Sequence, residues 1–242
     1  MKFQINTFNS LSSTNDKLPE LMNGKCVEGA VVVAKKQTSG RGQQNSSWES
    51  ENDKNLLFSV ALCPTFLKTG NMFYLSKAIS LAILDFLKEF GLEACIKWPN
   101  DIYIGDKKIC GILIEQKIQA EHIQQSYIGI GININQTLFH AAPNPTSVKL
   151  ETNRDTDIEE ALNKILQHIS FRYKMLQQGE MGQVDNEYLN RLYRATGFHA
   201  FSNEKETFKA QIVTVKSNGM LVLKTKSGEV RSYSSKQVEF VR

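Results

Sequence analysis

Apolar and polar positions follow strand-like and helix-like periods along most of the chain. Continuous apolar runs at 29–36 and 55–62 predict two buried strands. Weaker strand patterns occupy 2–8, 94–98, 102–104, 109–118 and 123–134. These strands are separated by helical segments, and this order predicts a sheet with helices packed against it.

Four segments carry helical signals. A short helix is expected from Ser12-Ser13-Thr14-Asn15, which are good capping residues, to about Gly24. Residues 72–90 place apolar side chains on one side and end at Gly91. A strong amphipathic helix follows the cap Asp157 and ends at Gly179, a shorter helix spans roughly 181–194, and residues 140–155 predict a polar loop.

Small residues recur at alternate positions of the strand at 123–134. Gly129 and Gly131 alternate there with isoleucines. Glycine inside a strand often marks a place where another group approaches the backbone closely. We therefore expect a contact or a ligand against one face of this strand.

The pattern changes near Ala195. From Gly197 onward the chain reads as short strands, with hairpin turn signals at Asn218-Gly219 and Ser227-Gly228. We predict a catalytic or binding domain at 1–194 and a small β-barrel-like module at 195–242. The module is small for independent stability, so we expect it to pack on the larger domain.

The composition indicates the broad class of protein. The chain has 242 residues, of which 41% are hydrophobic and 22% charged, with a formal net charge of +4. These values are typical of a globular protein with a sizeable core. The mild positive charge suits a phosphate-bearing small substrate or an acidic protein partner. It falls short of the dense basic clusters of duplex-DNA binders.

The cysteines and the termini suggest a compartment. Cys26, Cys63, Cys95 and Cys110 are scattered without a C-x-x-C pair, which argues against a zinc cage or a redox motif. We expect free thiols in a reducing compartment. No secretory signal opens the chain, and no apolar run approaches the ~18 residues that span a membrane. The expected location is cytoplasmic.

A polar, glycine-containing loop carries the first chemical signal. It runs from Gln37 to Trp48, directly after a buried strand, with Arg41 between Gly40 and Gly42. Backbone N–H groups and a guanidinium in such a loop can surround anionic oxygens. The spacing matches neither the dinucleotide fingerprint nor the Walker loop. Taken alone, it is more typical of an ordinary surface turn.

A second signal lies between Lys97 and Glu115. Lys97 ends a strand, Pro99 bends the chain, and Lys108 stands where a hairpin re-enters the sheet. A lysine at a strand end is usually solvated. Lys97 can also lay its stem over the neighbouring Trp98.

The ordered set of these motifs resembles the biotin protein ligases. The matching residues are Ser13-Thr14-Asn15, Gln37-x-x-Gly40-Arg41-Gly42, Trp48, Lys97-Trp98-Pro99-Asn100-Asp101, Lys108-x-x-Gly111-Ile112-Leu113-x-Glu115 and Gly129-x-Gly131-x-Asn133. The resemblance implies an α+β fold, with a mixed, mainly antiparallel sheet and flanking helices, as in class II aminoacyl-tRNA synthetases and lipoate ligases. It also implies an SH3-like C-terminal β-barrel.

The same resemblance implies a two-step reaction. Biotin and ATP, with Mg²⁺, would give biotinyl-5′-adenylate, and the biotinyl group would then pass to a lysine of a carrier domain in a carboxylase such as acetyl-CoA carboxylase. No tightly bound prosthetic group is implied. Some members repress transcription through an N-terminal winged helix, but only twelve residues precede Ser13 here, so DNA binding is not expected. Sheet-edge homodimers occur in the family, and no segment here demands one.

Residue roles follow from the resemblance. Lys108 would contact the biotin carboxylate and the α-phosphate, with Arg41 and Lys97 near the same phosphates. Ser13, Thr14, Asn15 and Gln37 would hydrogen-bond the ureido head of biotin, although Ser13-Thr14 also suits a simple helix cap. The further binding residues are Gly40, Gly42, Gln43, Trp48, Gly111 and Asn133. The metal ligands are not assigned.

Two questions stay open at this level. The run Gln43-Gln44-Asn45 replaces the basic, glycine-containing run of many relatives, which puts the retention of the adenylate in question. A related ligase for lipoate or another small acid, and a non-catalytic biotin-binding regulator, are the alternatives. Three cations at positions 41, 97 and 108 argue against a pure regulator.

Overall fold

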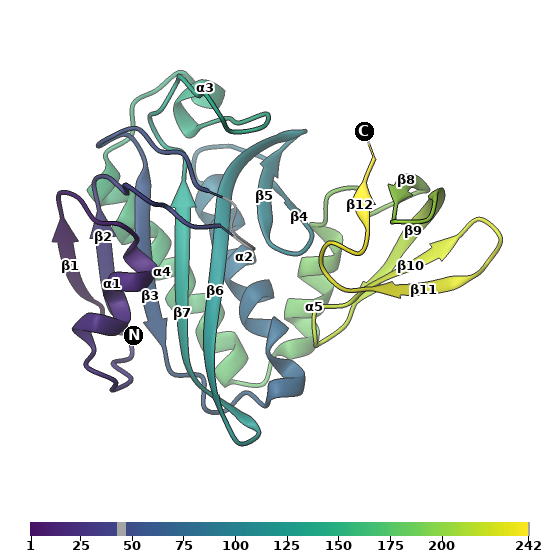
Figure 1. The fold of residues 1–242 in the computed structure, drawn as a ribbon, viewed down its shortest axis with the longest axis horizontal. Coiled ribbons are helices and arrows are strands. Elements are labelled where there is room, and N and C mark those ends of the chain that lie inside the picture. Colours follow the sequence, from purple (N-terminus) through teal and green to yellow (C-terminus); the bar gives the residue numbers. More distant parts are fainter. Residues whose placement is uncertain (43–46, 242) are drawn as a thin grey trace.

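The larger of two sheets has seven strands. The computed structural model describes residues 1–42 and 47–241 (Figure 1). The strands are β1 (Gln4–Phe8), β2 (Ala30–Ala34), β3 (Leu56–Leu62), β4 (Cys95–Lys97), β5 (Asp101–Ile104), β6 (Lys107–Gln119) and β7 (His122–Ile132). Their order in the sheet is β1-β2-β3-β7-β6-β5-β4. The pair β1–β2 is parallel and the other neighbouring pairs are antiparallel.

Helices cover both faces of this sheet. Helix α1 (Thr14–Leu21) lies on one face, over β2 and β3, and α2 (Phe73–Lys88) and α4 (Ile158–Gln177) lie on the other (Figure 1). Helix α5 (Met181–Asn190) packs against α2, and a short 3-10 turn at Thr69–Asn71 precedes α2. The Asp157 side chain caps α4 by accepting a hydrogen bond from the Glu160 backbone, as the sequence predicts.

One helix was not predicted. Residues 140–155 were expected to form a loop throughout, but α3 (Val148–Thr152) lies within them. The Ser147 side chain accepts a hydrogen bond from the Leu150 backbone, and Asn153 ends the helix in the left-handed conformation with φ 57°. A helix of five residues shows too little periodicity to be recognised in the sequence.

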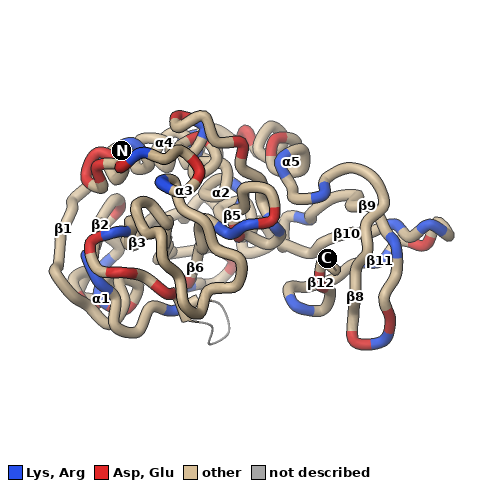
Figure 2. The backbone as a smooth tube through the Cα atoms, turned by 90° about the horizontal axis from the view of Figure 1, so that it is seen from above, with Lys and Arg blue, Asp and Glu red and all other residues tan. Residues whose placement is uncertain are grey.

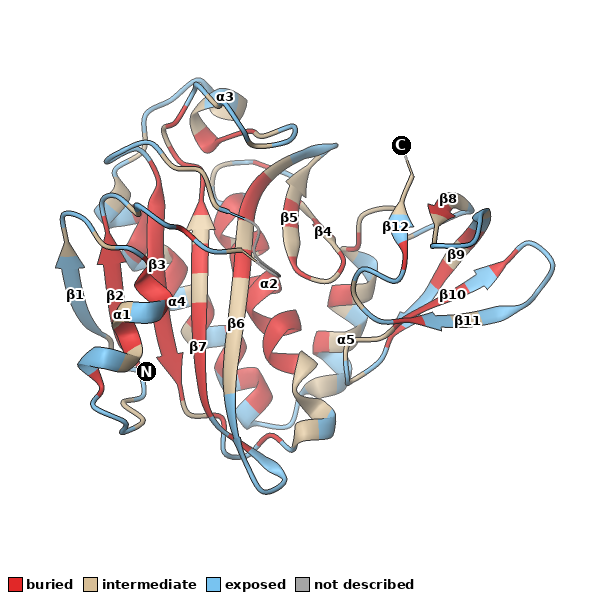
Figure 3. Cartoon of the chain, viewed as in Figure 1, coloured by how far each residue is buried: buried red, intermediate tan, exposed pale blue. Residues whose placement is uncertain are grey.

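The sheet separates two apolar cores. The main core lies between the sheet and the helices α2 and α4, and strands β2 and β3 are buried along their whole length (Figure 3). A second, smaller core lies under α1 and consists of Leu18, Met22, Ala30, Val32, Ala61 and Tyr127. This small core fixes the position of α1, whose first residues reach the strands that form the candidate site.

The C-terminal residues form a separate antiparallel sheet. Its strands are β8 (His199–Ser202), β9 (Thr207–Val215), β10 (Leu221–Thr225), β11 (Val230–Tyr233) and β12 (Glu239–Phe240), in the order β11-β10-β9-β8-β12. The expected α+β class, with a mixed, mainly antiparallel sheet and a small C-terminal β module, is confirmed. The domain boundary at 194/195 stays a prediction.

A buried lysine joins the two sheets through α2 and α5. Lys77 is 1% exposed, and its ammonium donates to Asp185 Oδ1 at 2.5 Å and to the Val215 carbonyl at 2.7 Å. The aromatic rings of Phe73, Tyr74 and Tyr188 surround it at 5.0–5.8 Å. Burial lowers the Lys77 pKa, and the Asp185 carboxylate opposes that shift. The Lys77 ammonium therefore helps to hold the C-terminal module, and its buried charge depends on the pairing with Asp185.

Further hydrogen bonds join the C-terminal module to the rest of the chain. Trp98 Nε1 donates to the Gly219 carbonyl at 3.0 Å, and the Phe73 backbone donates to the Ser217 carbonyl at 3.1 Å. The chain leading into the module also lies beside β4, where the Ile96 backbone bonds to Arg191 and Tyr193. These contacts confirm the expectation that the C-terminal strands pack on the larger domain.

The cysteines need a correction. Cys26 and Cys63 form a disulfide with a Cα–Cα distance of 6.2 Å, whereas Cys95 and Cys110 are free. The expectation of four free thiols was wrong because the fold brings the α1–β2 connection beside the end of β3. A separation of 37 residues carries no sequence signal for such a pair.

Charged residues of both signs are spread over the described part of the chain. Figure 2 shows basic and acidic segments interspersed along both sheets and their loops. Within residues 1–42 and 47–241, no helix combines the length and the apolar character needed to cross a membrane.

Candidate active site

A cavity of about 490 Å³ lies over β6 and β7, between the glycine loop and the C-terminal module. Its volume is that of a typical small-molecule site. The lining residues, which come from six segments, include Ser13, Thr14, Asn15, Gln37, Arg41, Gly42, Trp48, Lys97, Asp101, Lys108, Gly111, Leu113, Gly129, Gly131, Ser235, Lys236 and Phe240. One cavity thus brings together most of the site residues that the sequence predicts.

Glycines form the floor of the cavity. Gly111 on β6 pairs with Gly131 on β7, and the Trp48 indole lies against both. A Cβ atom at Gly131 would come within 2.6 Å of the indole, and one at Gly111 within 2.8 Å. At Gly129 a Cβ would lie 2.6 Å from Asn15 Oδ1. The predicted close approach to this strand is confirmed, and two side chains of the protein make it.

Polar groups gather where α1 begins. Asn15 Oδ1 lies 2.6 Å from the Ser59 hydroxyl, which is also 2.7 Å from Thr14 Oγ1. Gln37 Oε1 accepts from the Thr14 backbone at 2.8 Å and from its hydroxyl at 3.1 Å. Ser13 occupies the N-cap position, but its side chain makes no capping bond. These buried donors and acceptors suit a neutral, polar ligand group.

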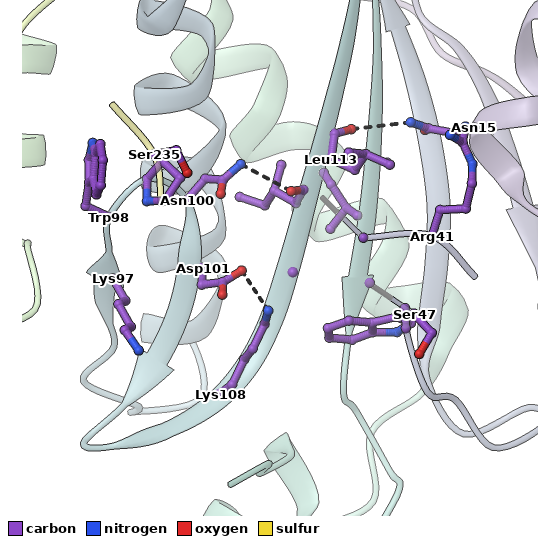
Figure 4. Close-up of a pocket in the computed structure, with 18 of the residues that line it drawn as sticks. Asn15, Arg41, Ser47, Lys97, Trp98, Asn100, Asp101, Lys108, Leu113 and Ser235 are labelled. Carbon is purple, nitrogen blue, oxygen red and sulfur yellow. Dashed lines mark hydrogen bonds and ion pairs between the residues drawn. The ribbon is translucent and has the colours of Figure 1, made fainter. Parts of the chain in front are cut away.

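Cations line the other end of the cavity. Lys108 Nζ pairs with Asp101 Oδ1 at 2.8 Å and lies 5.7 Å from the centre of the Trp48 ring. Lys97 Nζ lies 5.1 Å from the Tyr103 ring and 5.9 Å from the Phe240 ring of the C-terminal module. Figure 4 shows Lys97, Asp101 and Lys108 on one side of the site, with Asn15 and Arg41 across the β6 and β7 strands.

Arg41 is held by two carboxylates. Its guanidinium donates twice to Glu115, at 3.1 and 3.0 Å, and once to Asp16 at 2.7 Å. The hydrogen bonds to Glu115 are the main cause of a raised Arg41 pKa, with smaller contributions from the charges of both acids. Arg41 therefore stays fully charged, and its position depends on β6 and on the first turn of α1.

The C-terminal end of the glycine loop is anchored next to Trp48. The Glu49 carboxylate accepts hydrogen bonds from the backbones of His140, Ala141 and Ala142 at 2.7–2.8 Å. Burial favours the neutral acid, but these three donors outweigh it and lower the Glu49 pKa. At neutral pH the carboxylate is therefore charged and keeps the base of the loop attached to the segment that follows β7.

Two predicted site residues, Gly40 and Asn133, do not belong to the cavity lining, and a third, Gln43, lies outside the described residues. Gly40 is buried, and the Trp48 carbonyl lies 2.9 Å from the position that a Cβ would take there. Asn133 is 3% exposed, donates to the Thr146 carbonyl at 2.9 Å and does not belong to the lining residues. Binding roles for these three residues stay predictions.

The sequence also left residues of the site without a role. Ser59 orients Asn15, while Asp16 and Glu115 pair with Arg41. Ser235, Lys236, Val238, Glu239 and Phe240 of the C-terminal module line the cavity. Glu115 was present in the recognised motif, but neither the pairing of Arg41 nor the docking of the module can be read from local patterns.

The arrangement is suited to joining two anions. A glycine floor and an indole offer an apolar surface, and the start of α1 offers hydrogen bonds with Arg41 beside it. Lys97 and Lys108 lie at the opposite end (Figure 4). Fixed positive charges in a partly enclosed site reduce the repulsion between a carboxylate and a phosphate.

Comparisons with known proteins identify relatives over nearly the whole chain. The family model of the biotin/lipoate A/B protein ligase family matches residues 7–133. "Bifunctional ligase/repressor BirA" of Bacillus subtilis is 32% identical over 238 residues, covering 93% of this chain and 70% of the relative. "Biotin--[acetyl-CoA-carboxylase] ligase" of Mycobacterium tuberculosis is 29% identical over 152 residues, or 60% and 54% of the two chains.

A solved structure agrees with this result. The biotin protein ligase of Aquifex aeolicus in complex with biotin and ATP superposes with a TM-score of 0.82 and 25% identity, covering 98% of each chain. The match includes both the seven-stranded sheet and the C-terminal module. Family model, sequence identity and fold lead to one conclusion: this chain belongs to the biotin/lipoate A/B protein ligase family.

Proposed function

We propose that this chain is a biotin protein ligase, which activates biotin with ATP and transfers the biotinyl group to a lysine of a carrier protein. The observation that carries the proposal is a single cavity with a polar end, an apolar floor and a cationic end. Relatives named as biotin ligases, and a similar structure that holds biotin and ATP, support the same function.

The polar end fits the head of biotin. The ureido group has two N–H donors and one carbonyl acceptor, so it needs both kinds of partner in a small space. Asn15 and Thr14 offer an amide and a hydroxyl, and Gln37 offers a second amide. The thiophane ring and the valeryl chain are apolar and would lie beside the Trp48 indole, which covers Gly111 and Gly131. The chain would then lead the carboxylate toward Lys108.

The first step joins the acid to the nucleotide. A carboxylate oxygen of biotin attacks the α-phosphorus of ATP, the bond from that phosphorus to the bridging oxygen breaks, and pyrophosphate leaves. No proton transfer is required, so the main contributions are alignment and neutralisation of charge. Lys108 would exchange Asp101 for the reacting oxygens, and Lys97 and Arg41 would neutralise the phosphates.

The second step transfers the biotinyl group. The neutral amine of the carrier lysine attacks the carbonyl carbon of the mixed anhydride, AMP departs, and the nitrogen loses a proton. An amide bond replaces the anhydride bond. Lys108 would stabilise the negative charge that develops on the carbonyl oxygen and on the departing phosphate. A biotin carrier domain of a carboxylase is the proposed acceptor, by likeness to relatives named as acetyl-CoA-carboxylase ligases.

A preformed magnesium site does not form part of this proposal. The described residues contain no group of three or more His, Cys, Asp or Glu side chains that could hold a metal ion. Mg²⁺ commonly binds through substrate phosphates and water with few protein ligands. We therefore propose that Mg²⁺ enters with ATP, and we assign it no residue.

The proposal predicts transfer of biotin to a carrier domain. The protein is incubated with biotin, ATP, Mg²⁺ and a purified biotin carrier domain, and the product is probed with avidin and weighed by mass spectrometry. We expect a label that depends on ATP and on the acceptor lysine. A parallel reaction with lipoate and a lipoyl domain tests the alternative substrate. Failure to label the carrier while lipoate is transferred would identify a lipoate ligase, and binding of biotin without either transfer would identify a regulator.

A further inference from the structure

Arg41 is already engaged by protein anions at the site where it would meet phosphate. Three of its N–H groups are used by Glu115 and Asp16. With one positive and two negative charges, the cluster of Asp16, Arg41 and Glu115 carries a net charge of −1 at neutral pH. A phosphate that binds Arg41 therefore approaches an excess of negative charge unless one carboxylate gives way.

The two carboxylates differ in what else they do. Glu115 contacts Arg41 through both oxygens, which is the bidentate geometry that orients a guanidinium best. Its Oε2 atom also accepts from Asn15 Nδ2 at 2.8 Å. Because Asn15 Oδ1 faces Ser59, the bond to Glu115 completes the orientation of the Asn15 amide. Glu115 thus positions two side chains that line the cavity, Arg41 and Asn15.

Asp16 makes a simpler contact. One oxygen, Oδ1, accepts from Arg41 Nη2 at 2.7 Å, on the side of the guanidinium that Glu115 leaves open. Asp16 is the third residue of α1 and directly follows Asn15. Its side chain is 47% exposed. Exposed ion pairs of this kind are weak, so an incoming anion can replace one at little cost.

We propose that Glu115 is a positioning residue for Arg41 and Asn15, whereas Asp16 is a competitor that ATP phosphate displaces from Arg41. The inference rests on the proposed function for its ligand. Asp16 thereby sets the affinity for the nucleotide, and Glu115 sets the geometry in which both substrates are held. The two acids pair with the same guanidinium, yet their removal should change binding in opposite directions.

The first test removes the charge of Asp16 and keeps its shape. In Asp16→Asn, calorimetric titration of a non-hydrolysable ATP analogue into the biotin-saturated protein should give a dissociation constant about fivefold lower, the size expected for loss of one exposed ion pair. The dissociation constant for biotin should stay within about twofold, a range smaller than the effect of one such pair. Asp155→Asn, which removes an exposed acid paired with Lys149, is the matched control and should leave ATP affinity unchanged.

The second test uses Glu115→Gln. The amide places an NH2 group where Oε1 accepts from Arg41 and removes the negative charge, so the bidentate pair is lost and Asn15 keeps only a neutral acceptor. Biotin should bind several-fold more weakly, and adenylate formation should slow by about tenfold, the size expected when a charge-assisted hydrogen bond is lost. A thermal unfolding curve accompanies each variant. Unchanged biotin affinity in a folded Glu115→Gln protein would overturn the assignment of Glu115.

A double variant decides whether Asp16 acts through Arg41. In an Arg41→Gln background, Asp16→Asn should no longer tighten ATP binding. A gain in nucleotide affinity that persists in this background would mean that Asp16 repels the nucleotide directly. An unchanged nucleotide affinity in the single variant Asp16→Asn would mean that Asp16 does not compete at all. Either result overturns the inference. ATP binding by a wild-type protein that forms no adenylate would instead contradict the proposed function, while the comparison of affinities would still decide the role of Asp16.

Discussion

Replacing Lys108 by alanine should slow the formation of biotinyl-adenylate by about 10²–10³-fold, the usual loss when one charge-stabilising donor is removed from an active site. Lys108 lies at the start of β6, between Asp101 and the Trp48 ring, and points into the cavity. Its charge would stabilise both the attacking carboxylate and the pentavalent phosphorus, so the effect should fall on the maximal rate more than on ATP affinity. Pyrophosphate exchange and single-turnover trapping of the adenylate measure it.

The neighbouring lysine is the matched control. Lys107 is exposed, pairs with Glu151 and does not line the cavity. Lys107→Ala removes an equal charge one residue away and should change the rate less than twofold. Equal losses in the two variants would show that net positive charge near β6, rather than a placed ammonium, supports the reaction. Full activity of Lys108→Ala would remove Lys108 from the mechanism.

Removing Asp185 should destabilise the protein by about 3 kcal/mol, because the Lys77 ammonium then lacks its anionic partner. Lys77 is 1% exposed, whereas Asp185 is 39% exposed at its side chain, which places the effect at the lower end of the range for buried pairs. Lys77 also donates to the Val215 carbonyl of the C-terminal sheet. Chemical unfolding of Asp185→Ala measures the loss, and hydrogen exchange of β9 should show where it is felt.

A compensating variant tests the cause. Lys77→Met in the Asp185→Ala background replaces the unpaired charge by an apolar side chain of similar length and should restore most of the stability. Asp155→Ala, at a pair whose acid is 74% exposed, should change the unfolding free energy by less than about 0.5 kcal/mol. A double variant as unstable as Asp185→Ala alone would show that the site needs the hydrogen bonds rather than the neutralised charge.

Local patterns were enough to predict the framework of the site. Continuous apolar runs gave β2 and β3, and the alternation of glycine with isoleucine at 128–132 gave both a strand and a face that another group approaches. The reason is that a period of two reports directly which face of a strand is covered. The polar loop after β2 was predicted at the correct end of its strand.

The pairing of side chains that are distant in the sequence was not predictable in the same way. The glycine neighbours of Arg41 predict that it binds an anion, but its pairing with Asp16 and Glu115 arises where the first turn of α1 meets β6. The disulfide between Cys26 and Cys63 likewise depends on the position of α1 over the sheet. Such contacts join residues that are 25 to 74 positions apart, and no local period encodes them.

The contribution of the C-terminal module illustrates the same limit at a larger scale. Its strands were predicted from turn signals, whereas the residues from Ser235 to Phe240 reach the cavity only because Lys77 and Trp98 hold the module against α2 and β4. A rigid-body placement depends on many small contacts at once. The sequence therefore predicted that the module packs on the domain, but not that it helps to enclose the site.

A crystal structure of the chain with biotin and a non-hydrolysable ATP analogue is the most direct test of the proposed chemistry. We expect the ureido ring beside Thr14 and Asn15, the carboxylate and the α-phosphate within hydrogen-bonding distance of Lys108, and Arg41 on phosphate oxygens with Asp16 displaced. Two ligands in separate places, or a carboxylate held away from the α-phosphate with Lys108 still paired to Asp101, would contradict the account.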